Sequence, residues 1–345
     1  MPLEAPRRDL LLVFPTYAAA ALTDLPAHSV DAMFIDVLLR MHGCQLVRSG
    51  SPRFDRLTVA ELNRFRLIVV PCSAYLIPET YERLKQSTAT VLFTGCFGQS
   101  FDARLTPPGK ERQLDGSTLL YTRRPGGRLT AAGDHPLTKD LIRQPVFLPE
   151  DESFSYRKHG QDVRLLAHCG DCPLLSTRRQ GRFIFIHGHL FASLAYDPGR
   201  APPRRLSGSA DPSANEHDPW GRYSSANPQN AVGRRLVKNI LEYAGVDYRV
   251  TDPKPRQFTP YLGDHMEPAS ISANIAYNNT AEPQTLTVRL GYRPAGYKSK
   301  AVGNRFETDI TIPPFSYVAL QPATQDQAST ELPGPIERGS RRTGA

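Results

Sequence analysis

Short, unbroken apolar runs alternate with amphipathic segments over the first 250 residues of the chain. Runs such as LLLVF (residues 10–14) and LIVV (residues 67–70) are typical of strands that are buried on both faces. The segments between them carry apolar residues at helical spacing. Strands and helices that alternate in this way predict right-handed βαβ units, and hence an α/β fold with a doubly wound (flavodoxin-like), mostly parallel sheet. We expect strands at residues 10–14, 45–48, 67–70, 90–94 and 182–187, and helices at residues 29–42, 59–64, 78–86 and 230–245.

The pattern changes after residue 251, where apolar and polar residues alternate one by one. The segments ISANIAY, TLTVRL and FETDITI alternate in this way, and Asn-Asn, Gly and Pro signals separate them. Such alternation between turn signals predicts strands with one solvated face, as in a small antiparallel β-sandwich. The expected parts are an α/β domain at residues 1–250, a β-sandwich domain at residues 251–322 and a polar, disordered tail at residues 323–345.

Composition adds expectations about where the chain acts. The net charge is +8, but the basic residues are scattered and form no stripe interleaved with aromatic side chains, so nucleic acid is not an expected partner. No apolar run reaches the roughly 18 residues that span a membrane, and the first residues lack the long apolar region of a signal peptide. The five cysteines are an odd and mostly isolated set. We therefore expect no membrane association and a cytoplasmic, reducing location.

A cysteine comes directly after the fourth expected strand, in the sequence TVLFTGCFGQS (residues 90–100). Ligands bind at the carboxyl ends of parallel strands, and the glycines around Cys96 permit a tight turn that would expose it there. A thiol nucleophile needs a base within hydrogen-bond reach, and His187 and His189 end another strongly apolar strand, FIFIHGHLF. The alternative is that Cys96 is a small buried hydrophobe and that the histidines cap a strand end.

The order of these elements resembles the class I glutamine amidotransferases, which have a cysteine turn after one strand and a later strand that ends in His-Pro-Glu. The resemblance implies Cys96 as the nucleophile and His187 as the base. Thr94, however, stands at the first elbow glycine, and no carboxylate lies two residues after either histidine. The loop that ends at Tyr75 (PCSAY) lacks a glycine-rich oxyanion segment. Without an orienting carboxylate and oxyanion donors a Cys–His pair loses much of its power, so glutamine hydrolysis is not expected.

A resemblance within the same superfamily extends over residues 8–322. The segment FRLIVVPCSAYLIPETYERLKQSTATVLFTG is similar to the amidotransferase-like (trimerisation-type) domain of family 42 β-galactosidases. The segments QGRFIFIHGHLF and IPPFSYVAL resemble a later strand of that domain and the carboxyl-terminal β-domain of those enzymes. Those galactosidases carry their catalytic carboxylates on a preceding (β/α)8 barrel, which this sequence does not contain. The resemblance therefore implies a module without the carboxylate pair of a glycosidase.

Several other residues are candidates for binding. Glu152 belongs to a Glu-Asp-Glu cluster that is either a solvated turn or a ligand contact at the rim of the sheet. Trp220, in a long polar loop, either stacks on a sugar or packs onto its own domain, and Tyr75 is a further candidate contact. Cys169 and Cys172 flank a Gly-Asp dipeptide that predicts a two-residue hairpin turn. With His168 they would supply three zinc ligands, and the sequence offers no evident fourth. We therefore expect neither a metal nor a cofactor.

These observations support three hypotheses. The first is a non-catalytic or degenerate amidotransferase-like module that forms homo-oligomers or docks on a barrel-bearing glycosidase in carbohydrate metabolism. The second is a hydrolase that uses Cys96 with His187 or His189 on an amide or ester. The third is a carbohydrate-binding protein that uses the sheet rim and the loop around Trp220.

Overall fold

The computed structural model describes residues 8–14, 26–71, 73, 76–95, 111–143, 145–195, 229–251, 253, 269–272, 275–278, 283–313 and 316–323. These residues form two compact units. One unit extends to Asp247 but leaves out residues 40–44. The other contains residues 40–44, 248–256 and 265–345.

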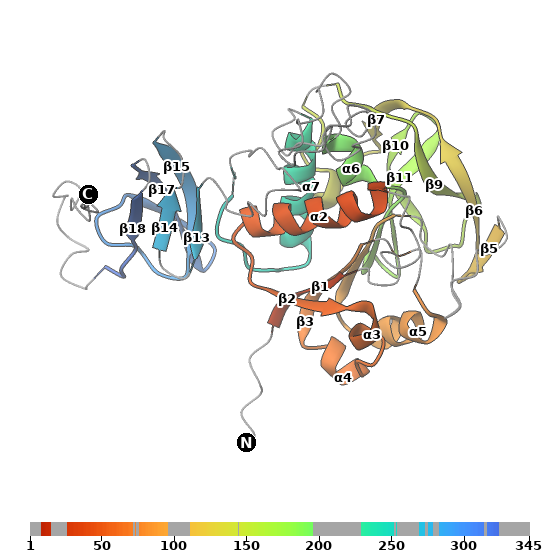
Figure 1. Cartoon of the computed structure of the whole chain (residues 1–345), viewed down its shortest axis with the longest axis horizontal. Coiled ribbons are helices and arrows are strands. Elements are labelled where there is room, and N and C mark those ends of the chain that lie inside the picture. The colour runs from red at the N-terminus through yellow and green to blue at the C-terminus, as the bar shows by residue number, and fades with distance from the viewer. Residues whose placement is uncertain are drawn as a thin grey trace, which may run out of the picture. The chain divides into compact units, whose positions relative to one another are not determined.

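A nine-stranded sheet in the order β2-β1-β3-β4-β12-β11-β10-β7-β8 forms the centre of the first unit (Figure 1). The first five strands in this order run parallel to one another. Most of their side chains are buried, apart from those of the edge strand β2, which explains their unbroken apolar sequences. These strands are β1 (Arg8–Phe14), β2 (Leu46–Gly50), β3 (Phe65–Val70), β4 (Thr90–Phe93) and β12 (Phe183–Ile186).

The other four strands of this sheet are antiparallel. The α/β class is confirmed, but the expectation of a mostly parallel sheet is wrong in this half. Parallel neighbours need a crossover of about a dozen residues or more, whereas β10, β11 and β12 follow one another through short turns. Gly170 permits the first turn with a φ of 56°, and Arg179, Gln180 and Gly181 all have positive φ in the second. The strands are β7 (Gly127–Ala131), β8 (Phe147–Leu148), β10 (Arg164–Cys169) and β11 (Cys172–Arg178).

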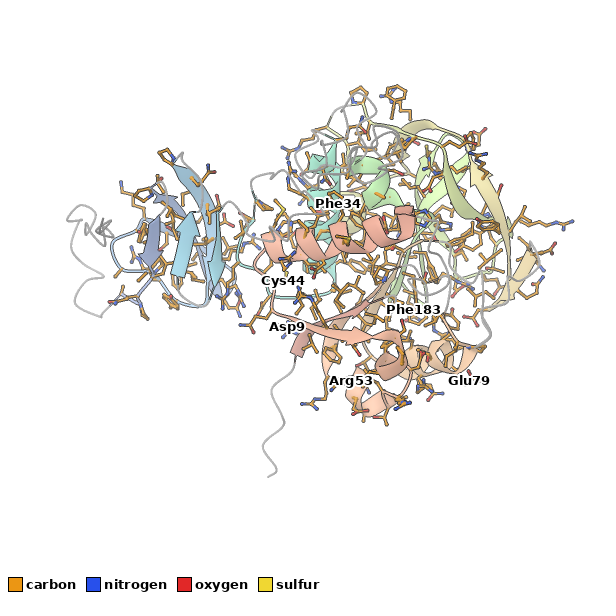
Figure 2. All side chains as sticks on the ribbon, viewed as in Figure 1. Asp9, Phe34, Cys44, Arg53, Glu79 and Phe183 are labelled. Atoms are coloured by element: carbon orange, nitrogen blue, oxygen red, sulfur yellow. The ribbon has the colours of Figure 1, made fainter. Side chains whose placement is uncertain are left out.

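Helices cover both faces of the parallel half, with α2, α6 and α7 on one face and α3, α4 and α5 on the other (Figure 1). Helix α2 begins at Pro26, before the expected start at residue 29, since proline is well tolerated in the first turn of a helix. Figure 2 labels Phe34 of α2 and Phe183 of β12, two fully buried aromatic side chains. In the described ranges, no helix is long and apolar enough to cross a membrane. The helices are α2 (Pro26–Met41), α3 (Ser51–Phe54), α4 (Val59–Leu62), α5 (Pro78–Gln86), α6 (Leu190–Ala195), α7 (Asn230–Tyr243) and the 3-10 helix η1 (Pro136–Thr138).

A separate antiparallel sheet, β5-β6-β9, packs on the large sheet. Its Leu114 and Phe154 share one apolar core with Phe93 and Phe185 of the large sheet. Strand β9 is absent from the expectations drawn from the sequence, although Phe154 and Tyr156 alternate with serines (SFSY), which is typical of a half-buried strand. The strands are β5 (Glu111–Leu114), β6 (Ser117–Arg124) and β9 (Asp151–Lys158).

The second unit contains two small antiparallel sheets, β13-β14-β18 and β15-β17-β16. Both contribute to one apolar core, in which Ala276, Leu286 and Ile310 take part. The alternating sequence is the cause, because it places the apolar residues of a strand on one face. Beyond residue 323, the expected tail lies outside the described residues. The strands are β13 (Ala269–Ser272), β14 (Ile275–Asn278), β15 (Gln284–Leu290), β16 (Ser299–Val302), β17 (Arg305–Ile312) and β18 (Ser316–Ala319).

Candidate functional site

The parallel neighbours β4 and β12 end side by side at the carboxyl edge of the sheet. Just beyond them, Gly95 and Gly188 exchange two backbone hydrogen bonds, with N···O distances of 3.0 and 3.2 Å. Both glycines have positive φ angles, 81° and 94°, which residues with a side chain rarely adopt. Cys96 follows Gly95 in the sequence and His189 follows Gly188, so the segments that contain them begin at neighbouring points. Cys96 itself lies outside the described residues.

His187 follows β12 directly and is buried in a network of neutral hydrogen bonds. Its Nδ1 lies 2.9 Å from the carbonyl oxygen of Phe154, and its Nε2 lies 2.7 Å from Oγ of Ser176. Because a carbonyl can only accept, Nδ1 carries the proton and Nε2 accepts from Ser176. The Tyr156 hydroxyl, 3.2 Å from the same Oγ, then donates to it. We call Tyr156, Ser176 and His187 the neutral cluster.

The surroundings of His187 keep its ring uncharged. Burial lowers the pKa of His187 to about 3. The ring also stacks on Phe154, with ring centroids 4.0 Å apart, as a core side chain does. Both ring nitrogens of His187 therefore have neutral partners in the core.

His189 pairs with a carboxylate that is distant in the sequence. Its Nδ1 lies 2.8 Å from Oδ1 of Asp151, and its backbone N–H donates to Oδ2 of the same residue at 2.7 Å. Asp151 is the first residue of β9 and precedes His189 by 38 positions. Because a carboxylate accepts the Nδ1 proton, the pair selects the tautomer in which Nε2 is the basic nitrogen. Strand β9 therefore supplies the orienting carboxylate that is missing from the sequence around the histidines.

A buried arginine stands behind this pair. Arg124 is directly opposite Asp151 in the register of β6 and β9, and its Nη2 lies 3.6 Å from Oδ2 of Asp151. Its Nη1 lies 2.9 Å from Sγ of Cys169. Burial by itself would raise the pKa of Asp151, but the hydrogen bonds from His189 and the charge of Arg124 hold that pKa below its ordinary value. Asp151 is therefore an anion at neutral pH.

A second buried carboxyl group, that of Asp31 on α2, contacts the segments that follow β4 and β12. Its Oδ2 accepts a hydrogen bond from the Thr94 hydroxyl at 2.8 Å. Its Oδ1 accepts from the backbone N–H groups of Phe191, at 2.9 Å, and Ala192, at 3.2 Å. Thr94 follows β4, and the two amides lie in the first turn of α6, two and three residues after His189. One carboxylate thus connects the end of β4 with the start of α6.

The charge on Asp31 depends on its neighbours. Burial raises the pKa of Asp31 to about 6, and the negative charge of Asp151 adds to that rise, whereas His189 opposes it. The site therefore holds two carboxyl groups of unequal acidity around one imidazole, an arrangement that is typical of sites that move protons. The members of this charged cluster are Asp31, Arg124, Asp151 and His189.

The residues predicted from the sequence fall into two groups. His187 and His189 are described, and only His189 faces a carboxylate. The side chain of Glu152 lies outside the described part of the structure. Cys96, Tyr75 and Trp220 also lie outside it, so their assignment as site residues stays a prediction.

Three members of the charged cluster do not appear among those predicted residues. Arg124 and Asp151 lie in short runs of like charge, Arg-Arg and Glu-Asp-Glu, which are visible in the sequence although their pairing is not. The β6–β9 register sets Arg124 opposite Asp151 and Arg123 opposite Glu152. Asp31 is a polar residue within an otherwise apolar helix face, which is a weaker signal.

The two cysteines of the CGDC sequence lie near this site. Cys169 and Cys172 are opposite each other in the β10–β11 hairpin, on either side of the Gly-Asp turn that the sequence predicts. Cys169 is fully buried against Arg124, and Cys172 is half-buried. Across the described ranges, no group of three or more His, Cys, Asp and Glu side chains is placed to hold a metal ion.

Comparison with known proteins shows likeness of fold only. No family model matches the sequence, and no curated protein matches it. A β-galactosidase from the psychrophilic Marinomonas ef1 aligns over 91% of this chain and 38% of its own length, with 11% identity and a TM-score of 0.51. The chain thus spans well under half of that enzyme and shares its fold over the aligned part.

Two weaker matches are shorter proteins. A protein described as ThuA-like from Bacteroides uniformis aligns over 55% of this chain and 86% of its own, with 15% identity and a TM-score of 0.39. A protein described as a GMP synthase component from Thermoplasma acidophilum aligns over 69% of this chain and 96% of its own, with 12% identity and a TM-score of 0.38. Likeness at this level supports no conclusion about activity.

Proposed function

We propose that the chain is a hydrolase of amides or esters with an amidotransferase-like fold, in which His189 is the general base, Asp151 orients it and Cys96 is the nucleophile. The observation that carries this proposal is the hydrogen bond between His189 Nδ1 and Asp151 at the carboxyl edge of the sheet. The paired glycines support it, because the segment with Cys96 begins beside the segment with His189. Of the two histidines that the sequence offers as the base, the proposal takes His189.

The reaction would use these side chains in turn. His189 Nε2 takes the proton of the Cys96 thiol, and the thiolate attacks the carbonyl carbon of the substrate to form a tetrahedral intermediate. When the intermediate collapses, the bond to the amine or alcohol breaks, and this leaving group takes the proton back from His189. Water, deprotonated by the same nitrogen, then cleaves the acyl thioester to a carboxylic acid and the free thiol.

Asp151 would act through the imidazole rather than on the substrate. Each proton transfer creates an imidazolium, and an adjacent carboxylate in a buried site stabilises that cation strongly. The lowered pKa of Asp151 keeps this carboxylate charged throughout the neutral range. The negative charge that stabilises the imidazolium is therefore in place before the first proton transfer.

Thiol reactivity of the full chain tests the proposal. Iodoacetamide is added at pH 7, and mass spectrometry follows alkylation of Cys96 and of Cys172, whose pKa is raised by burial. We expect Cys96 to react about tenfold faster than Cys172, because a thiol beside a general base is more strongly ionised at this pH than an isolated thiol. His189→Asn and Asp151→Asn should each slow Cys96 by about tenfold, and Cys172→Ser should leave it unchanged.

A panel of p-nitrophenyl esters and anilides supplies the second readout. Cys96→Ser should abolish their hydrolysis, and His189→Asn should lower it by about 10²–10⁴-fold. Equal alkylation rates at Cys96 and Cys172 would contradict the proposal. An unchanged Cys96 rate in the His189→Asn variant would contradict it as well.

A docking module remains the second candidate, and two observations favour it. The fold likeness covers nearly all of this chain but less than half of a β-galactosidase, and the His189 side chain is only 3% exposed. In this case the chain forms homo-oligomers or binds a barrel-bearing glycosidase, and the charged cluster only stabilises the fold. Light scattering over a wide concentration range, with and without a purified (β/α)8-barrel glycosidase, tests this. A strictly monomeric chain that binds no barrel would rule it out.

A further inference from the structure

The two oxygens of the buried Asp31 carboxyl group bind two different segments of the chain. Oδ2 binds the hydroxyl of Thr94, which follows β4, and Oδ1 binds the amides of Phe191 and Ala192, which open α6. The first contact spans 63 positions of the sequence and the second spans 160. A carboxylate that served only as a helix cap would need the second set alone.

The two segments are the ones that the proposed reaction must keep in register. Thr94 precedes Gly95, and Phe191 lies two positions after His189. The backbone hydrogen bonds between Gly95 and Gly188 also link the two segments. Asp31 thus adds a side-chain connection, made from α2, to a short backbone contact.

We propose that Asp31 is a positioning residue that clamps the end of β4 to the start of α6 and so fixes the distance between the two segments that carry the reacting groups. The clamp itself is independent of catalysis, and its role in the reaction rests on the proposed function. Its ligands are one hydroxyl and two amides, all buried, so the carboxylate is held in one orientation.

This role accounts for a residue that the family resemblance leaves unexplained. Thr94 stands where an amidotransferase has the first glycine of its elbow. Its side chain is fully buried, and its hydroxyl needs a partner there, which Asp31 provides. The threonine is therefore part of the clamp as well as a departure from the elbow pattern.

The charges that face Asp31 make the clamp sensitive to pH. His189 favours the ionised form of Asp31, and Asp151, itself paired with Arg124, disfavours it. The Thr94 hydroxyl and the α6 amides also favour the anion, since donors bind a charged acceptor more strongly. We expect the clamp to tighten as the pH rises through about 6, the pKa to which burial raises Asp31.

Amide hydrogen exchange of the full chain, resolved by NMR, tests the clamp without any activity. In Asp31→Ala, the amides of Phe191 and Ala192 should exchange about tenfold to a hundredfold faster, because they lose a charged acceptor. The decisive amides are those of Gly95 and Gly188, which Asp31 does not contact. A clamp predicts about tenfold faster exchange there too, whereas a cap of α6 predicts no change.

Thr94→Val is the second variant, and it keeps the test valid if Asp31→Ala does not fold. It removes one hydroxyl and leaves the α6 amides bonded, so it should speed exchange at Gly95 and Gly188 while changing Phe191 by less. Asp36→Asn is the matched control, since Asp36 lies on the same helix but pairs with Arg48 at the surface. This control should leave all four amides as in the wild type. Unchanged exchange at Gly95 and Gly188 in both test variants overturns the clamp.

The pH dependence of amide protection separates a charge-dependent clamp from a contact that only fills space. In the wild type, protection of the Gly95 and Gly188 amides beyond intrinsic exchange should increase as the pH rises through about 6. Asp31→Asn cannot ionise, so its protection should be flat over the same range. A parallel rise in this variant would overturn the proposed clamp. If instead the exchange results hold and Cys96 is inert to iodoacetamide, the clamp stands and the proposed hydrolase fails.

Discussion

The neutral cluster contains His187 and the charged cluster contains His189, two residues further along the chain. Both histidines are buried, but their partners differ in charge. In the neutral cluster every donor meets one neutral acceptor, from Tyr156 through Ser176 to the imidazole. In the charged cluster the imidazole meets a carboxylate, with a guanidinium and a second carboxyl group close by. Both rings are almost completely buried, so burial alone does not separate them.

The difference shows what a partner does to a buried base. Neutral partners complete the hydrogen bonds of the ring but do not stabilise its protonated form. The ring therefore stays neutral and acts as part of the core. An anionic partner stabilises the protonated ring in a buried place, which is the condition for a general base. Whether a buried histidine can act as a base therefore depends on the residue that faces its ring and not on its position along the strand.

The largest expected effect comes from breaking the neutral cluster with His187→Gln. Burial holds the folded pKa at about 3, below the ordinary 6.5, so between these values only the unfolded chain binds this proton. The stabilising effect of the neutral ring is thus complete above pH 6.5 and is lost as the pH falls toward 3. Urea unfolding at several pH values should show wild type losing on the order of 5 kcal/mol over this window relative to the variant. Parallel pH dependences would contradict a neutral buried ring.

A smaller effect should follow from removing the cation of the charged cluster with Arg124→Met. Its removal leaves Asp151 buried without its cation, which costs about 3 kcal/mol by urea unfolding at pH 7. Arg123→Met is the matched control, because the neighbouring Arg123 side chain is 75% exposed and pairs with the exposed Glu150. That control should cost less than about 1 kcal/mol. Equal costs would show that Arg124 does not support Asp151.

The smallest effect is expected for Tyr156→Phe, which removes one hydrogen bond from the neutral cluster. The loss should be about 1 kcal/mol by urea unfolding at pH 7, since Ser176 keeps its bond to His187. Ser176→Ala should cost more, because it strips both Tyr156 and His187 of a partner. The double variant then tests the chain of bonds: it should cost less than the sum of the two single variants. Simple additivity would mean that the three side chains act separately.

Part of the site was predictable because the relevant signals are local. The apolar runs before Cys96 and His187 identify two strand ends, and glycine marks the turn after each of them. The acidic run that contains Asp151 is visible too, but such a run is equally typical of a turn or a rim contact. The sequence does not predict its strand, β9, because two serines and two aromatic residues make a short and weak alternation.

The sequence by itself determined the α/β class, the alternating strands after residue 251 and the strand end that carries two histidines. Hydrophobic periodicity and turn residues act over a few neighbours, so these features can be read from short segments. Only the tertiary structure decided which histidine faces a carboxylate. The pairing of β6 with β9, and the packing of that sheet on β12, bring Arg124 and Asp151 to His189 and the Phe154 carbonyl to His187. Such contacts join residues tens of positions apart, and no local pattern encodes their register.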